Sequence, residues 1–227
     1  MAALTASTAP VSVMPASMVK ARVLNRYRPL PAWPRMFAIG KLRHDNLFDE
    51  LEEAIALWEN PRKIIDIGCG YGLPACWLAE RFPNVHIFGC DPDQQRVFFA
   101  QRAVADRGDM LVGAAPDLPE QLPNGCDLAL FLDMAHYLSD EQARASFSRC
   151  RKLLHEHGGL LARFVIRPTT RISFSWHFED LKTRFRGLAT HYRTLDEMRA
   201  MATAAGFTET TIQPSANADM FWLVAKR

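Results

Sequence analysis

Three glycines in alternate positions follow a short apolar run, and their spacing is the clearest sign of ligand chemistry in the chain. In KIIDIGCGYG, Gly68, Gly70 and Gly72 come directly after a run typical of a buried strand, and Leu73 and Pro74 then begin a helical pattern. Glycine permits a tight turn with positive φ and lets the backbone approach a ligand closely, and a following helix offers free N–H groups. We therefore expect a small polar ligand at this loop.

The spacing of these glycines argues against two common nucleotide loops. A dinucleotide fingerprint is G-x-G-x-x-G, whereas here the third glycine comes one residue early and Leu73 stands in its expected place. A phosphate-cradling P-loop ends in lysine followed by serine or threonine, and this loop does not. The pattern therefore disfavours NAD and excludes a P-loop.

An acidic residue ends the next apolar run. Asp91, in VHIFGCDPD, lies 21 positions after Gly70. A carboxylate at the end of a neighbouring strand faces the same crevice, where its oxygens can accept from both hydroxyls of a ribose. The alternative role of Asp91 is to cap the following helix, a role that Asp93 could also fill.

Short apolar runs alternate with helical patterns through the middle of the chain. The runs KIIDIG, VHIFGC, MLVGAA, DLALFLD and LLARFVI are typical of strands buried on both faces. Their alternation with helices predicts a parallel sheet. Two last runs, FTETTIQP and DMFWLVAKR, are joined by residues 215–217 only, and so short a link predicts an antiparallel hairpin.

Local signals also mark the ends of the helices. Ser139 with Gln142 and Thr194 with Glu197 have the spacing of capping boxes, and Gly206 is placed to stop a helix. These signals predict helices that begin at about residues 140 and 195.

The N-terminal part divides into two segments before the main domain. Residues 1–18 are rich in Ala, Ser, Thr and Pro without periodicity, which predicts a flexible arm. Residues 19–45 mix arginines with aromatic residues and hold Pro29, Pro31 and Pro34, which should break any long helix and favour a lid or substrate-facing segment. Residues 46–227 form the expected domain, with an insertion at about 168–193, and Asp45 can cap its first helix.

Composition places the chain among ordinary globular proteins. Its 227 residues are 48% hydrophobic and 23% charged, with a formal net charge of +2. This near balance does not demand a nucleic-acid partner, although seven basic residues cluster early, namely Lys20, Arg22, Arg26, Arg28, Arg35, Lys41 and Arg43. Five scattered cysteines, the lack of a leader pattern and the lack of an apolar run of membrane-spanning length favour a cytoplasmic location.

The strand, the D-I-G-C-G-Y-G loop, the acidic residue and the closing hairpin together resemble the class I S-adenosylmethionine-dependent methyltransferases over roughly residues 46–227. The resemblance implies an α/β fold: a doubly wound, mostly parallel, seven-stranded Rossmann-like sheet of order 3-2-1-4-5-7-6 with strand seven antiparallel. It implies S-adenosylmethionine as cofactor and no metal.

The resemblance also assigns residues to the cofactor. Asp66, Gly68 and Gly70 would hold the methionine portion, Asp91 the ribose, and Pro92 would lie beside the adenine. Family members often hold the adenine amino group with an acidic residue after the third strand, but Ala114 stands there, so backbone groups of Ala114 and Ala115, or Asp117, must serve. In FLDMAHYL, Asp133 and Met134 would line the cofactor, while His136 and Tyr137 would face the acceptor.

Methyl transfer needs mainly the alignment of acceptor and methyl group, and a base only where the acceptor must lose a proton. His136 is the first candidate base, followed by His177 and His44, because histidine titrates near neutral pH. The alternative for His136 is a packed core residue. The acceptor pocket is expected between residues 19–45 and the insertion.

The stretch PRMFAIGKLRHDNLF is similar to the N-terminal part of small methyltransferases in bacterial aryl-polyene pathways. This resemblance implies a small-molecule acceptor with a hydroxyaryl or acyl-type group. Such an acceptor can be attached to a carrier protein. Two alternatives stay open: a nucleic-acid methyltransferase that uses the early basic cluster, and a non-catalytic scaffold that only binds S-adenosylmethionine.

Overall fold

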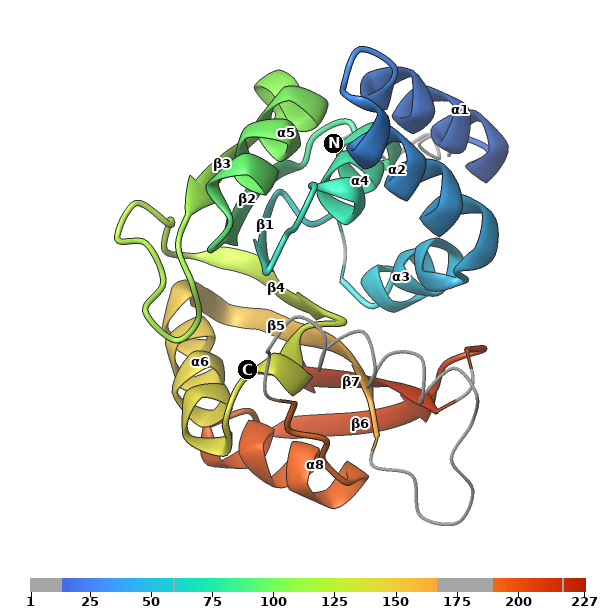
Figure 1. Ribbon diagram of the computed structural model, residues 1–227. Coiled ribbons are helices and arrows are strands. Elements are labelled where there is room, and N and C mark those ends of the chain that lie inside the picture. Colours follow the sequence, from blue (N-terminus) through green and yellow to red (C-terminus); the bar gives the residue numbers. More distant parts are fainter. Residues whose placement is uncertain (1–13, 59, 167–189, 218) are drawn as a thin grey trace, which may run out of the picture.

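The computed structural model describes residues 14–58, 60–166, 190–217 and 219–227, and these form a seven-stranded sheet of order β3-β2-β1-β4-β5-β7-β6 (Figure 1). Strand β7 is antiparallel to β5 and β6, and the other neighbouring pairs are parallel. The predicted fold class is therefore confirmed. The strands are β1 (Lys63–Ile67), β2 (His86–Asp91), β3 (Gly108–Val112), β4 (Cys126–Leu132), β5 (Leu154–Val165), β6 (Glu209–Pro214) and β7 (Met220–Lys226).

Two layers of helices cover the sheet (Figure 1). The helices are α1 (Ala16–Tyr27), α2 (Ala32–His44), α3 (Leu47–Ile55), α4 (Leu73–Arg81), α5 (Gln94–Val104), α6 (Asp140–Leu153) and α8 (Leu195–Ala204), with 3-10 turns η1 (Ala105–Arg107) and η2 (Ala135–Tyr137). Side chains of α1 to α5 share one apolar core with Ile64, and those of α6 and α8 share the other with Ile65. Strands β1 and β4 and the second half of β5 are therefore buried on both faces, as their continuous apolar runs predict. β3 is only partly buried, because it lies at the edge of the sheet.

The third strand is shorter than its apolar run. β3 ends at Val112, whereas the run MLVGAA extends to Ala115. Gly113 still donates its N–H to the carbonyl of Asp91, and the chain then turns away from the sheet at Pro116. Proline has no N–H to donate to a strand ladder, so the ladder could not have continued past Ala115.

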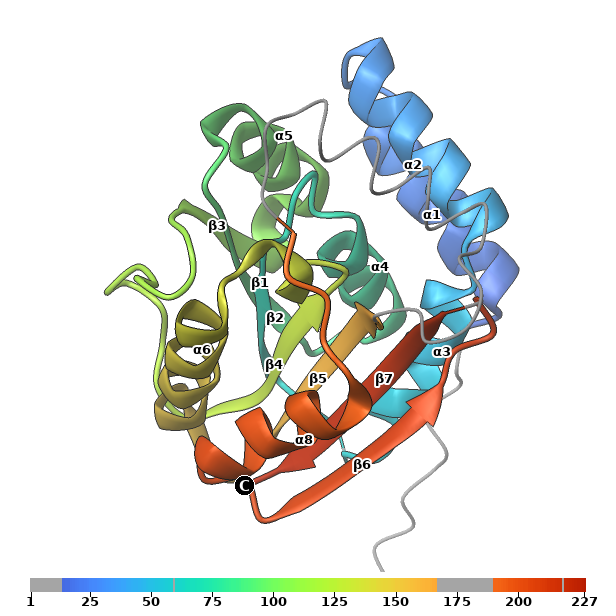
Figure 2. The same cartoon turned by 60° about the horizontal axis from the view of Figure 1, so that its bottom comes forward.

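Helices α1 and α2 lie side by side as an outer layer on α4 and α5 (Figure 2). α1 begins at Ala16, inside the segment 1–18 that the composition predicts to be a flexible arm; residues 1–13 are outside the described ranges. Pro29 and Pro31 separate the two helices, but Pro34 lies in the first turn of α2, where its missing N–H costs no hydrogen bond. Residues 19–45 are thus mostly helical.

The predicted caps are present. Ser139 and Thr194 each form a complete capping box, at α6 and α8, and Gly206 follows α8 with a φ of +93°. The side chain of Asp45 accepts from the N–H of Leu47, the first residue of α3. No helix within the described ranges is long and apolar enough to cross a membrane.

Candidate active site

The glycine loop after β1 has the backbone conformation that its sequence predicts. Gly68, Gly70 and Gly72 have φ values of +76°, +54° and +74°. The N–H of Gly68 donates to the carbonyl of Cys90 at 2.8 Å, which joins the loop to β2. A Cβ atom built on Gly70 would meet no atom within 4 Å, so the backbone there faces open space that a ligand could fill.

Asp91 bridges the end of β2 and this loop. One carboxylate oxygen accepts from the N–H of Gly70 and the other from the N–H of Asp93, both at 3.0 Å. Each oxygen keeps acceptor capacity for a further donor, such as a ribose hydroxyl. The cap of α5 is Asp93, whose side chain accepts from Gln95 and Arg96, so the capping role considered for Asp91 is wrong.

Asp66 is a buried carboxyl group two residues before Gly68. Only 1% of its surface is exposed, and its Oδ2 atom has no hydrogen-bond partner in the described part of the chain. Burial, followed by the charge of Asp91, raises the pKa of Asp66 to about 7. A cationic ligand group would supply the missing partner and favour the ionised form. The residues therefore fit the ammonium group of a methionine portion.

Met134 lies against the glycine loop. A Cβ atom on Gly68 would come within 3.1 Å of its Cγ atom, so the side chain covers that side of the loop. Pro92, Ala114 and Ala115 follow β2 and β3 at the same edge of the sheet. The fold thus brings Asp66, Asp91 and Met134 to one edge, together with these three residues.

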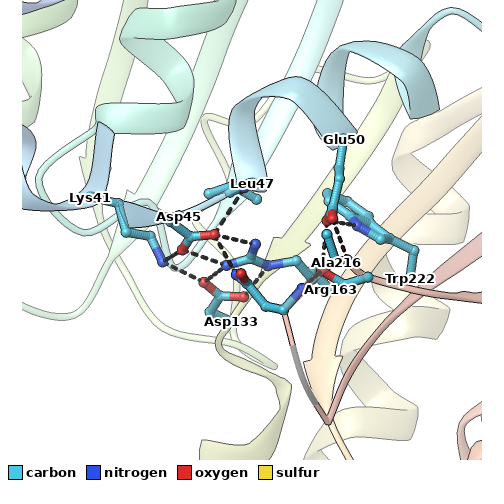
Figure 3. A network of polar contacts seen from close by, with 10 residues as sticks. Lys41, Asp45, Leu47, Glu50, Asp133, Arg163, Ala216 and Trp222 are labelled. Carbon is cyan, nitrogen blue, oxygen red and sulfur yellow. Dashed lines mark hydrogen bonds and ion pairs between the residues drawn. The ribbon is translucent and has the colours of Figure 1, made fainter. Parts of the chain in front are cut away.

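Asp133 takes part in an ionic network around the buried Arg163 (Figure 3). Arg163 of β5 is fully buried, and its Nε and Nη2 atoms donate to the two carboxylate oxygens of Asp133 at 2.7 and 2.6 Å. A second bidentate pair joins Arg163 to Asp45 at 2.7 and 2.8 Å. Lys41 of α2 binds both carboxylates, at 2.8 Å to Asp133 and 2.5 Å to Asp45. Two positive and two negative charges balance each other.

The network keeps its members ionised. Burial would raise the pKa of Asp133, but Lys41 and Arg163 outweigh it and hold that pKa below its ordinary value. Burial acts on Asp45 in the same way, and hydrogen bonds from Arg163 with the charge of Lys41 again lower its pKa. For Lys41, burial lowers the pKa, but the two carboxylates raise it by a larger amount. The pKa of Lys41 therefore lies above its ordinary value.

A second group of contacts joins α3 to the hairpin of β6 and β7 (Figure 3). The carboxylate of Glu50 accepts from the indole N–H of Trp222 at 2.7 Å and from the backbone N–H of Ala216 at 2.6 Å. Asn217 donates to Asp45 at 2.7 Å, which links this group to the Arg163 network.

The N-terminal helices also support the glycine loop. Tyr27 of α1 is fully buried, and its hydroxyl donates to the carbonyl of Tyr71 at 2.6 Å. Burial raises the pKa of Tyr27 well above its ordinary value, so it acts as a neutral donor. The ring of Phe37 of α2 lies 5.3 Å from that of Tyr71, centre to centre. Residues 19–45 therefore hold the loop from outside.

His136 lies in η2, two residues after Met134. Its ring stacks on Tyr192 at 6.0 Å with an interplanar angle of 11°, and contacts the ring of Tyr137 at 4.1 Å. Its carbonyl accepts from the N–H of His191. His136 is half-buried and Tyr137 partly exposed, and both follow the end of β4. His44 is exposed at the end of α2. His177 lies outside the described residues.

Arg193 fixes the position of η2. It is 3% exposed, and its Nη1 and Nη2 atoms donate to the carbonyls of Ala135 and Leu138 at 2.8 and 2.6 Å. Its Nε atom donates to Asp140 at 2.9 Å.

Within the described chain, no cluster of three or more His, Cys, Asp or Glu side chains could hold a metal ion.

Comparison with known proteins agrees with this geometry. Residues 64–158 match the family described as "Methyltransferase domain". Demethylmenaquinone methyltransferase of Thermotoga maritima is 27% identical over 112 residues, 49% of this chain and 47% of that protein. Anthranilate N-methyltransferase of Ruta graveolens is 27% identical over 154 residues, 66% of this chain and 40% of that protein. The matched regions are thus less than half the length of either relative.

A solved structure shows the same fold. Mitomycin 7-O-methyltransferase superposes with a TM-score of 0.65 at 17% identity, covering 94% of this chain and 69% of that one. Residues 64–158 are thus similar to methyltransferase domains, and the fold is similar to that of solved S-adenosylmethionine-dependent methyltransferases. S-adenosylmethionine is the cofactor that methyltransferases of this family use.

Removal of the buried guanidinium tests the ionic network. Arg163→Met should lower the free energy of unfolding by about 3–5 kcal/mol, because it leaves two buried carboxylates without their main partner. Denaturant unfolding measures the loss, with Arg144→Met on the exposed side of α6 as the control. A loss below ~1 kcal/mol would show that Arg163 is not the residue that neutralises Asp45 and Asp133.

The raised pKa of Asp66 predicts a pH dependence of stability without ligand. A carboxyl whose folded pKa is about 7 binds a proton more tightly in the folded than in the unfolded chain. Its contribution to stability therefore falls as pH rises from the ordinary aspartate range, ~4, through about 7. Asp66→Asn should be more stable than the wild type at pH well above about 7 and lose this advantage in acid. Equal effects in acid and base would contradict the raised pKa.

Proposed function

We propose that this chain transfers the methyl group of S-adenosylmethionine to an oxygen or nitrogen atom of a small-molecule acceptor. The observation that carries the proposal is the loop of three positive-φ glycines, which has open space at Gly70 and two carboxyl groups beside it. Asp66 offers a buried oxygen without a partner, and Asp91 offers an acceptor held at the loop. These groups fit the cationic and ribose ends of the cofactor.

Each part of the site then has a task. Asp66, Gly68 and Gly70 would hold the methionine portion and Asp91 the ribose, while Pro92, Ala114 and Ala115 would border the adenine. Bound S-adenosylmethionine supplies a methyl group activated by a sulfonium, so the protein mainly aligns the acceptor with it. We assign Asp133 a positioning role in place of the expected cofactor contact, because its carboxylate is engaged by Arg163 and Lys41. It fixes the end of β4, from which Met134 reaches the loop.

The acceptor is proposed to be a small aromatic molecule. Phe37, Tyr71 and Tyr137 lie on segments at this edge of the sheet, and planar rings pack well against such side chains. The names of anthranilate N-methyltransferase and demethylmenaquinone methyltransferase point to small acceptors for those relatives. The resemblance of residues 34–48 to aryl-polyene methyltransferases favours a hydroxyaryl group, free or on a carrier protein.

A hydroxyl acceptor requires the loss of a proton, and His136 is our proposed base. It lies two residues after Met134 in the turn η2. Arg193 holds this turn by donating hydrogen bonds to two backbone carbonyls at its ends. Tyr137 beside it would border the acceptor, and His177 stays an alternative base. A rigid turn suits a base because proton transfer requires a fixed distance to the reacting group.

Binding calorimetry tests the cofactor site directly. S-adenosylmethionine and its demethylated product should bind in the micromolar range, and Asp91→Ala should weaken both because a ribose acceptor is lost. Asp93→Ala is the matched control, since it removes the cap of α5 and should lower stability with little change in affinity. Binding of NADH but of neither sulfur compound would refute the assignment.

Turnover tests His136 separately. His136→Ala should lose about 10²- to 10⁴-fold in methylation rate of a hydroxyaryl acceptor while binding S-adenosylmethionine normally. His155→Ala, at the opposite end of β5, should keep the wild-type rate. A loss in His136→Ala of less than about threefold would fall outside general-base catalysis and would return this histidine to a packing role.

A further inference from the structure

Helix α2 presents a row of large apolar side chains to solvent. Trp33, Met36 and Phe37 are 67%, 59% and 42% exposed. Their spacing of three and four residues places them on one side of the helix. Large apolar side chains gathered on one exposed helix face are typical of interaction sites. The proposed methyl transfer uses Phe37 but does not account for the exposure of Trp33 and Met36.

The same two helices carry charge of one sign. Residues 14–44 contain seven lysines and arginines and no aspartate or glutamate. Arg22 and Arg26 bind Glu80, and Lys41 belongs to the buried network. The other four pair with no carboxylate in the described ranges and are Lys20, Arg28, Arg35 and Arg43. We call the outer surface of these two helices the α1–α2 face. It holds the apolar row of α2, and these four cations lie on the same two helices or at their ends.

A shallow groove of about 340 Å³ runs between α1 and α2. Its lining includes the apolar side chains of Ala21, Leu24 and Ile39 together with the guanidinium groups of Arg28 and Arg35. Apolar walls beside cationic groups are the complement of a molecule that has an alkyl chain and an anionic head.

We propose that the α1–α2 face docks on an anionic lipid surface. An interfacial helix of this kind inserts Trp, Phe and other apolar side chains at the headgroup boundary while Lys and Arg bind anionic lipid. The two helices form the outer layer of the molecule, where a flat surface can reach them (Figure 2). A second copy of the chain is disfavoured as occupant, because two faces of the same positive sign repel each other.

Docking of this kind would bring the glycine loop close to the lipid. Phe37 belongs to the exposed row and also contacts Tyr71 of the glycine loop. An acceptor dissolved in the lipid would then have a short path to the strand ends. The docking itself does not depend on methyl transfer, so it is tested without any activity measurement.

Vesicle co-sedimentation of the full chain tests the proposal. The chain should bind vesicles of mixed phosphatidylcholine and phosphatidylglycerol, and bind pure phosphatidylcholine far more weakly. Arg35→Gln with Arg43→Gln should weaken binding roughly 25-fold, because each basic residue near an anionic surface contributes about fivefold. Arg144→Gln with Arg199→Gln removes the same charge from α6 and α8 and should leave binding nearly unchanged.

The apolar part is tested by Trp33→Ser with Met36→Ser, which should weaken vesicle binding about tenfold or more. Leu57→Ser, at another exposed apolar position, is the control. No binding to the mixed vesicles, or equal binding to both kinds, would overturn the proposal. Binding that depends on the arginines but not on Trp33 and Met36 would overturn the insertion of the apolar row, and with it the proposal, and would leave only electrostatic attraction to anionic surfaces.

Discussion

A single buried arginine imposes the arrangement of the site. Burying a guanidinium group lowers the stability of the fold by several kcal/mol unless carboxylates neutralise it. Arg163 is fully buried within the sheet. Asp133 comes from the neighbouring strand end, but Asp45 comes from the junction of α2 and α3, 118 residues away in sequence. The α2–α3 junction is therefore bound to the edge of the sheet where β4 ends, and the hairpin joins it through Asn217.

This constraint fixes the cofactor loop from two directions. Asp133 is held by Arg163 and Lys41 in a positive-φ conformation of +57°, and the next residue, Met134, packs on Gly68. From the other side, Tyr27 holds the carbonyl of Tyr71. A glycine loop gains binding strength from being held in its bound shape before the ligand arrives, because less conformational entropy is then lost on binding. Helices α1 and α2 thus help to hold the glycine loop in its shape.

Local patterns in the sequence predicted most of the helices and strands. They could not predict contacts between side chains that lie far apart in the sequence. The apolar runs, the capping boxes at Ser139 and Thr194 and the short hairpin link each depend on residues close in sequence, so the strands and helix starts followed from them. The order of the strands in the sheet followed from the family resemblance. The ion pairs of Asp133 did not follow, because its partner Arg163 lies on another strand. The one available signal was the lone arginine in LLARFVI, since a charge within a buried strand requires a partner. Asp91 and Asp93 were separated only by the structure, which shows which of them caps α5.

The most direct test of the central claim is a crystal structure of the full chain with S-adenosylhomocysteine. The account predicts the ligand along the loop of Gly68 and Gly70, with its amino group at the carboxyl of Asp66 and its ribose hydroxyls at Asp91. The ionic network of Arg163 should be unchanged by the ligand. A ligand bound elsewhere on the chain, or bound at the loop without contact to Asp66 and Asp91, would contradict the account.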